Sequence, residues 1–173
     1  MMTTSRLLTL MAHAHEEWEH ALNFVGSLRL GIGGVSGRWS VRDLLAQLLM
    51  REQYLADRLY EIIEHGRPRP PSQTEQELLD FFATFGYPDY ESPLLTEIEA
   101  DEWAVRRLLS IPLVELVELE LRAYEAIYEA VSTLSEAQLH RERLYEHILR
   151  YTVERYRRYT AEIRKRFPTP LRR

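Results

Sequence analysis

The most constraining feature of this 173-residue chain is a set of long apolar stripes at helical spacing. Within each stripe an apolar side chain recurs every three or four residues, so that all of them share one face of a helix. Such a face must be buried against another helix. No segment alternates strictly between apolar and polar residues as a strand meander does, and the pattern predicts an all-α antiparallel four-helix bundle. Four stretches carry a stripe: about 4–26, 40–65, 112–131 and 143–166.

The connections between these helices are unequal. Residues 72–111 separate the second long helix from the third, and within them 74–85 and 94–109 are expected to form short helices. The length and the 45% hydrophobic content suit one domain with its own core. We predict a single domain over residues 1–173, in which 72–111 is a crossover. The pattern does not decide whether this crossover covers a site as a lid or only connects the helices.

Local signals mark where two of the helical segments begin. Ser40 precedes the second stripe and is followed by Asp43, a hydroxyl N-cap with an acid in the first turn. Ser135 and Gln138 repeat a capping-box pattern at the start of the last segment. Both predict a defined helix start.

Composition excludes several classes of protein. The chain has no cysteine, so disulfide scaffolds and thiol nucleophiles are ruled out. It has no uncharged apolar run of the length that spans a membrane, and residues 1–11 lack a signal-peptide core. We therefore expect a cytoplasmic protein without a membrane partner.

Charge is divided unevenly along the chain. Basic and acidic residues number 22 and 27, a net charge of −5, and we do not expect nucleic-acid binding. From Leu139 onward there are eleven basic and four acidic residues (+7), which leaves −12 for the preceding part. Packing of a basic last helix on acidic partners explains this division best, and a surface for nucleic acid or anionic lipid is the alternative.

The histidines do not form a metal-binding pattern. No two of the six are three or four residues apart, as ligands on one helix face must be. No Glu-x-x-His motif is turned toward a core, as a di-iron bundle requires. The sequence predicts neither a protein-bound metal nor any other cofactor.

A polar flank follows the apolar stripe on two of the long helices. At ~100° per residue, each flank lies roughly 40–120° from the stripe. Such a flank can line a cleft between helices, or it can be an ordinary helix edge with its polar ends in water. Both interpretations stay open. The flanks contain Gln47, Arg51, Tyr54 and Arg58 on the second helix, and Thr152, Arg155, Tyr159 and Glu162 on the last.

One motif resembles a known family. The run Gly37-Arg38-Trp39-Ser40-Val41-Arg42-Asp43-Leu44-Leu45-Ala46-Gln47 looks like the start of the second helix in the DinB-like superfamily of four-helix bundles. The stretch after Leu95, through 101–103 to 135–139, resembles the ClbS/DfsB-like branch in particular, and so does the ending Glu154-Arg155-Tyr156-Arg157-Arg158-Tyr159.

The resemblance implies a pocket between helices but not the metal that many of its members hold. Three histidines bind a divalent metal in those members, and the corresponding positions here are Gln47, Arg155 and Tyr159. An amide, a guanidinium and a phenol do not replace three imidazoles around a divalent cation. The resemblance therefore implies the fold and a pocket lined by the two polar flanks, without the metal.

Three functions follow from these expectations. The first is a metal-independent hydrolase or binding protein for a small reactive or anionic molecule. In this hypothesis Arg51 and Arg155 hold an anion, Tyr54 or Tyr159 donates a proton, and Gln47 and Thr152 line the site. The second is a degenerate thiol-transferase-type bundle with a stress-related binding role. The third is a structural interaction module that forms a homodimer through a helix face. Whether the protein is an enzyme is left open.

Overall fold

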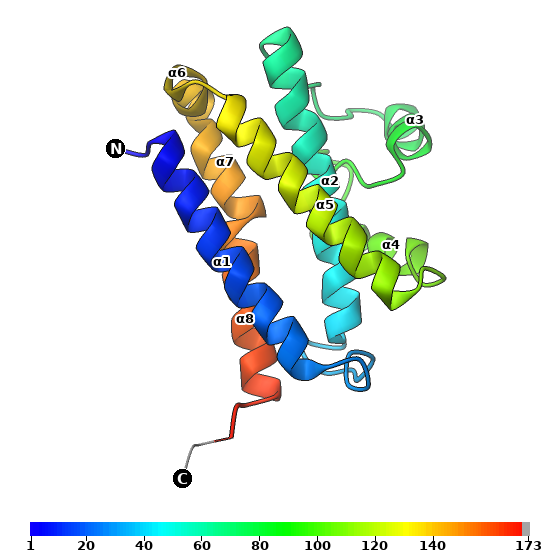
Figure 1. The fold of residues 1–173 in the computed structure, drawn as a ribbon. Coiled ribbons are helices and arrows are strands. Elements are labelled where there is room, and N and C mark those ends of the chain that lie inside the picture. The colour runs from blue at the N-terminus through cyan, green and yellow to red at the C-terminus, as the bar shows by residue number, and fades with distance from the viewer. Residues whose placement is uncertain (171–173) are drawn as a thin grey trace. The chain divides into compact units, whose positions relative to one another are not determined.

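The computed structural model of the protein describes residues 1–170, and these are predominantly helical (Figure 1). Over this range the backbone forms no strand, and Ser36 and Trp39 make an isolated bridge. The predicted all-α class is confirmed. The helices are α1 (Thr4–Val25), α2 (Val41–His65), α3 (Glu75–Phe85), α4 (Glu97–Arg107), α5 (Leu113–Thr133), α6 (Glu136–His140), α7 (Leu144–Tyr151) and α8 (Val153–Arg166), with a 3-10 turn η1 (Arg141–Arg143).

The chain forms two compact units. Of the described residues, 1–44 and 134–170 make the first unit, and 45–133 make the second. The first unit therefore contains α1 and α6–α8, and nearly all of α2 lies in the second with α3, α4 and α5. None of the helices in residues 1–170 has both the length and the apolar character needed to cross a bilayer.

The first unit is built on the packing of α1 along α8. The indole of Trp18 lies against the ring of Tyr159 with centroids 6.2 Å apart, and His15 meets Tyr156 edge-on at 5.1 Å. All four side chains are buried. The predicted stripe on α1, from Leu7 to Val25, is buried along its whole length. This confirms the prediction that these residues share the buried face of a helix.

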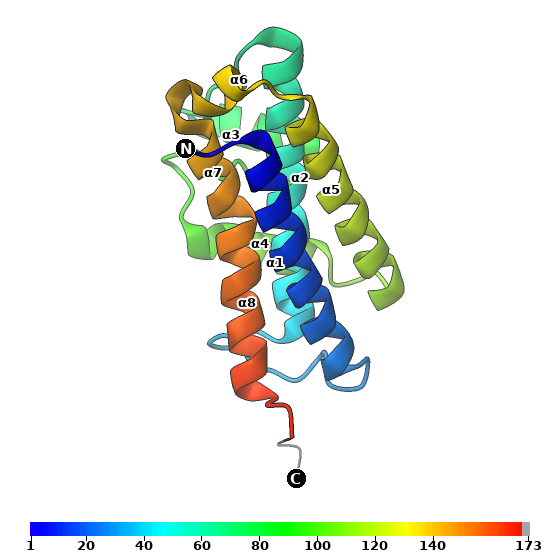
Figure 2. The same ribbon diagram turned by 60° about the vertical axis from the view of Figure 1, so that its left-hand side comes forward.

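Within each unit the paired long helices run in the same direction. Figures 1 and 2 show this for α1 beside α7 and α8. They show the same shared direction for α2 and α5. Helix partners joined by a short loop run antiparallel, the arrangement expected from sequence, and the long connection between the second and third long helices already made a simple up-down-up-down series less favoured. Here residues 66–112 join α2 to α5, and this connection is long enough to return the chain to the starting end of α2.

The last long helix is broken at Thr152. A continuous helix was expected over 143–166, but Thr152 has φ −115° and ψ −89° and separates α7 from α8. Its hydroxyl donates to the carbonyl of Ile148 at 2.7 Å, a bond that commonly bends helices. The change of register buries Ile148 and Tyr151 and leaves Leu149, which the stripe placed in the core, only half-buried.

The start of α2 has the predicted capping arrangement. The Asp43 amide donates to the Ser40 hydroxyl at 3.1 Å, and the Ser40 amide donates to the Asp43 carboxylate at 2.9 Å. This reciprocal pair satisfies two amides that the first helical turn leaves without partners. Gly66 (φ 82°) ends α2 in the left-handed region that favours glycine. The capping box of Ser135 and Gln138 at α6 is confirmed as well.

A buried hydrogen-bond cluster closes the crossover at its base. The carboxylate of Asp89 accepts from the amide and the hydroxyl of Ser72 at 2.9 and 2.7 Å. Ser92 in turn donates to the Ser72 carbonyl at 2.7 Å. These bonds join the segment before α3 to the segment after it. The two ends of the region that contains α3 are therefore held close together.

Candidate functional site

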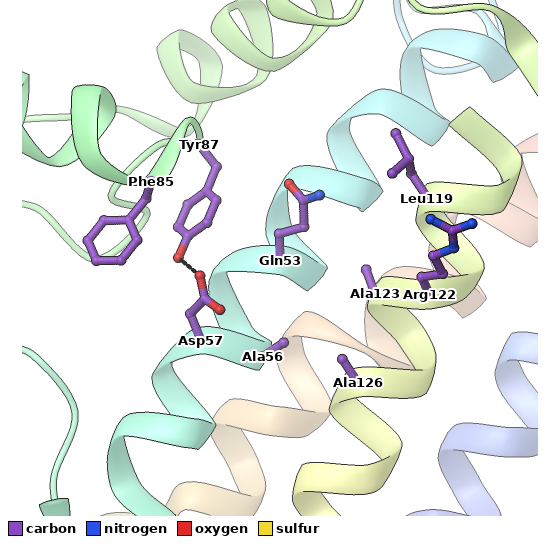
Figure 3. A pocket seen from close by; sticks show the side chains of 9 residues that line it. All are labelled: Gln53, Ala56, Asp57, Phe85, Tyr87, Leu119, Arg122, Ala123 and Ala126. Carbon is purple, nitrogen blue, oxygen red and sulfur yellow. Dashed lines mark hydrogen bonds between the residues drawn. The ribbon is translucent and has the colours of Figure 1, made fainter. Parts of the chain in front are cut away.

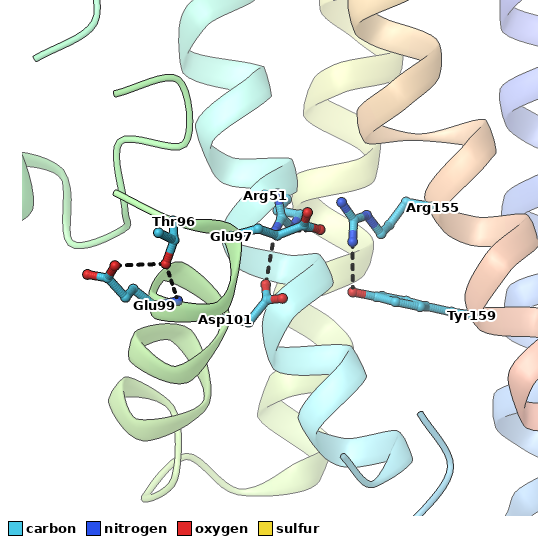
Figure 4. Close-up of polar contacts among 7 residues, drawn as sticks. All are labelled: Arg51, Thr96, Glu97, Glu99, Asp101, Arg155 and Tyr159. Atoms are coloured by element: carbon cyan, nitrogen blue, oxygen red, sulfur yellow. Dashed lines mark hydrogen bonds and ion pairs between the residues drawn. The ribbon is translucent and has the colours of Figure 1, made fainter. Parts of the chain in front are cut away.

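The predicted polar residues of α2 lie in the second unit, and Arg51 is held there by acids from α4. Its guanidinium lies 2.9 Å from the Asp101 carboxylate and 3.6 Å from Glu97, as Figure 4 shows. It also covers the ring of Tyr90 at 4.4 Å. Gln47, one turn earlier, is buried. The charge of Arg51 therefore already has counter-charges within the chain.

Tyr54, the predicted proton donor of α2, lies in an aromatic cluster. Its ring contacts Phe81, Tyr87 and Tyr90 with centroids 5.5 to 6.3 Å apart. Burial is the main reason that the pKa of Tyr54 is raised well above its usual value, and the nearby carboxylates of Asp89 and Glu91 raise it further. Tyr54 is consequently a neutral phenol at physiological pH.

Arg58 is enclosed by the same cluster. Its guanidinium lies 5.1, 5.2 and 4.8 Å from the ring centres of Tyr54, Phe81 and Phe85. One amino group pairs with Glu61 at 2.9 Å. An arginine stacked among aromatic rings and paired with an acid stabilises the junction of α2 and α3.

The predicted residues of α8 lie in the first unit. Thr152 forms the break between α7 and α8, and the ring of Tyr159 is packed on Trp18. Half-buried Arg155 donates to the Tyr159 hydroxyl at 3.4 Å (Figure 4). The two positions of α8 that correspond to metal ligands in the resembled family thus hold a cation bonded to a phenol. These groups do not fit a divalent metal.

A cleft of about 370 Å³ lies within the second unit, between α2, α5 and the end of α3 (Figure 3). Its apolar surface comes from Ala56 of α2, from Ala123 and Ala126 of α5, and from Leu119 and the ring of Phe85. Small side chains facing each other across two helices leave space that larger ones would fill. The volume is in the range of pockets that bind small molecules.

Four polar groups border this cleft. Tyr87 donates its hydroxyl to the carboxylate of Asp57 on one wall, and Arg122 of α5 stands across from them in Figure 3. Gln53 adds an amide from α2. Arg122 is exposed and makes no ion pair with any residue in 1–170. The cleft therefore offers a cation without an ion pair in residues 1–170 on one wall and a hydrogen-bonded carboxylate on the other.

The phenol of Tyr87 is kept protonated by its surroundings. Burial raises the pKa of Tyr87 well above its usual value, and the hydrogen bond to Asp57 raises it further. Arg58, whose guanidinium lies 3.4 Å from the hydroxyl, opposes this shift only in part. Tyr87 therefore remains a hydrogen-bond donor that holds Asp57 in place.

The raised pKa values of Tyr54 and Tyr87 predict a loss of stability in alkali. Above about pH 10 the unfolded chain releases protons from these phenols, whereas the folded protein retains them. The free energy of unfolding should be level below about pH 10 and should fall above it by roughly 1.4 kcal/mol per pH unit for each phenol. Urea unfolding followed across this pH range measures the slope. Tyr54→Phe should make the slope shallower, and an unchanged slope in that variant would contradict the assignment.

Two buried carboxylates also approach each other between α2 and α5. Oxygens of Glu52 and Glu120 lie within 4.8 Å. Each of the two side chains has an interaction within the chain, so neither is free to act as an empty ligand site. The pair is separate from the residues that line the cleft.

Sequence reasoning missed the cleft, although one of its signals was visible. Arg122 is the one basic residue among the twenty-one of α5, which carries five glutamates. Asp57 and Tyr87 gave no such signal, because their contact joins residues 30 apart across the turn after α3. Comparisons of the chain with known protein families, with characterised proteins and with solved structures gave no match.

Proposed function

We propose that the protein binds a small organic anion in the cleft between α2 and α5. The observation that carries this proposal is Arg122, a cation without an ion-pair partner in residues 1–170, at a cleft of about 370 Å³ with both apolar and polar lining residues. A guanidinium binds carboxylate or phosphate through two parallel hydrogen bonds, which gives both affinity and orientation. The alanine-lined space next to it accommodates the apolar body of the ligand.

The carboxylate on the opposite wall of the cleft indicates which further group the ligand should carry. Asp57 already accepts one hydrogen bond from Tyr87, and its carboxylate retains capacity for further donors. A ligand with a hydroxyl or an ammonium group at the end remote from its anionic group would satisfy both walls. A purely anionic ligand would leave Asp57 without such a donor, so we favour a ligand with both kinds of group.

We propose binding rather than turnover at this cleft. The lining groups that could act as nucleophiles are Asp57 and Tyr87, and they are hydrogen-bonded to each other. Hydrolysis at the predicted polar residues remains the alternative proposal, with Arg51 or Arg155 holding an anion and with Tyr54 or Tyr159 as the proton donor. The internal ion pairs of Arg51 favour a structural role for that residue in either case.

The DinB-like assignment also remains a proposal. Its support is the motif from Trp39 to Gln47, whose Ser40 and Asp43 form the capping pair at the start of α2. The resemblance gives a precedent for a pocket between helices, and the residues at the corresponding metal positions support a metal-independent variant of that fold.

Titration calorimetry with three small probes tests the proposal. The probes are benzoate, benzylamine and 4-(aminomethyl)benzoate, which carry an anion, a cation and both. We expect the order 4-(aminomethyl)benzoate, then benzoate, then benzylamine. Arg122→Gln should weaken binding of the two carboxylates by about 10- to 100-fold, because it removes a charged hydrogen-bond partner.

Arg107→Gln is the matched control, because Arg107 is exposed on α4 in the same unit and lies outside the cleft. Its affinities should equal those of the unmodified protein. The proposal fails if no carboxylate probe binds, or if both variants weaken binding equally.

A further inference from the structure

One face of α5 carries a second apolar stripe that stays partly or largely exposed among the described residues. Val114, Val117, Leu121, Tyr124 and Tyr128 follow one another at spacings of 3, 4, 3 and 4 residues. Val114 is 72% exposed, and Val117, Leu121 and Tyr128 are 38–40% exposed. The buried stripe of α5, which includes Leu116 and Ile127, lies on another face. A globular-protein helix with one buried stripe is normally polar elsewhere, so this second stripe indicates a contact surface.

A row of unpaired acids borders the stripe on one side. Glu118, Glu125 and Glu129 lie roughly 40–80° around the helix from Leu121 at ~100° per residue. All three are exposed, and none forms an ion pair with a residue in 1–170. The face therefore consists of apolar side chains at heptad spacing, with glutamates that form no ion pair in residues 1–170 along one edge.

We propose that this face of α5 binds a basic amphipathic helix of a partner protein. Apolar anchors at spacings of three and four residues are what a helix presents to another helix. The apolar side chains of the partner would cover Val117, Leu121 and Tyr128. Lysine or arginine on its flank would pair with Glu118 and Glu125, and this charge complementarity selects the partner.

A second copy of the chain fits this face less well. Two α5 helices that cross antiparallel at Leu121 about a two-fold axis would place Glu118 of each copy beside Glu125 of the other. The two resulting pairs of like charges repel each other. With a basic partner this repulsion between glutamates is absent, and Glu118 and Glu125 attract the partner's positive charges instead.

Two synthetic helical peptides with identical leucine heptads test the proposal, one with lysine on its flanks and the other with glutamate. Fluorescence anisotropy with the full chain should show binding of the lysine peptide only, weakening as salt is added. Leu121→Gln should lower this affinity by about tenfold or more. The double variant Glu118→Lys with Glu125→Lys should reverse the preference to the glutamate peptide.

Leu79→Gln is the matched control, since Leu79 is an exposed leucine on α3, and it should leave binding unchanged. Sedimentation of the free protein tests whether a second copy of the chain binds this face instead. The proposal is overturned if the lysine peptide does not bind, if both peptides bind equally, or if Leu121→Gln abolishes a concentration-dependent dimer. Circular dichroism confirms that each variant is folded.

Discussion

Arg51→Ala should destabilise the protein by about 3–5 kcal/mol, because it removes one partner of a buried ion pair. The Arg51 side chain is 6% exposed and that of Asp101 is 12% exposed, with nitrogen and oxygen 2.9 Å apart. After the truncation, the Asp101 carboxylate keeps its charge without the guanidinium that compensates it. Urea unfolding followed by circular dichroism measures the change in the free energy of unfolding.

The surface pair Arg143–Glu146 provides the control for this measurement. Its nitrogen–oxygen distance of 3.0 Å is similar, but the side chains are 73% and 43% exposed. Exposed pairs contribute little, so Arg143→Ala should leave stability close to that of the unmodified protein. Equal effects of Arg51→Ala and Arg143→Ala would contradict the structural role assigned to Arg51.

Trp18→Ala should cost a similar amount, about 3–5 kcal/mol, because it opens a cavity between α1 and α8. Trp18 is fully buried, and its ring contacts Tyr159. Its indole Nε1 has no hydrogen-bond acceptor within residues 1–170. Trp18→Phe, which removes that buried donor and keeps an aromatic ring, should therefore cost clearly less than Trp18→Ala.

Thermal and urea unfolding of the two Trp18 variants test this expectation. Leu28→Ala is the control in the same unit, because Leu28 is 96% exposed and contributes no buried surface. It should not change the stability measurably. If Trp18→Phe destabilises the protein as much as Trp18→Ala does, the indole nitrogen has a role that the packing does not explain.

The helices could be predicted from sequence because their causes are local. The stripe on α1 and the capping pair of Ser40 and Asp43 depend on residues at most four apart, and the structure confirms both. The break at Thr152 depends on where the threonine hydroxyl forms its hydrogen bond, which the sequence does not determine. A threonine inside a helix either points to solvent or bonds to the preceding turn, and here it bonds to Ile148.

The site could be predicted less well because its contacts cross long stretches of chain. The flank of α2 was recognised as polar, yet the partner of Arg51 is Asp101, fifty residues away in the crossover. Periodicity within α2 cannot show which acid the folded crossover brings to it. The cleft depends on tertiary structure in the same way, since Tyr87 follows α3 in the chain and contacts Asp57 thirty residues earlier.

The most direct test of the proposed function is to locate a bound probe by NMR of alanine methyl groups. In protein with labelled alanines, addition of 4-(aminomethyl)benzoate should shift the methyl signals of Ala56, Ala123 and Ala126, which line the cleft. The signals of Ala14 and Ala21, in the core of the first unit, should stay in place. Saturable shifts confined to the cleft alanines, and lost in Arg122→Gln, are the result we predict. Saturable shifts that leave the cleft alanines unaffected would contradict it.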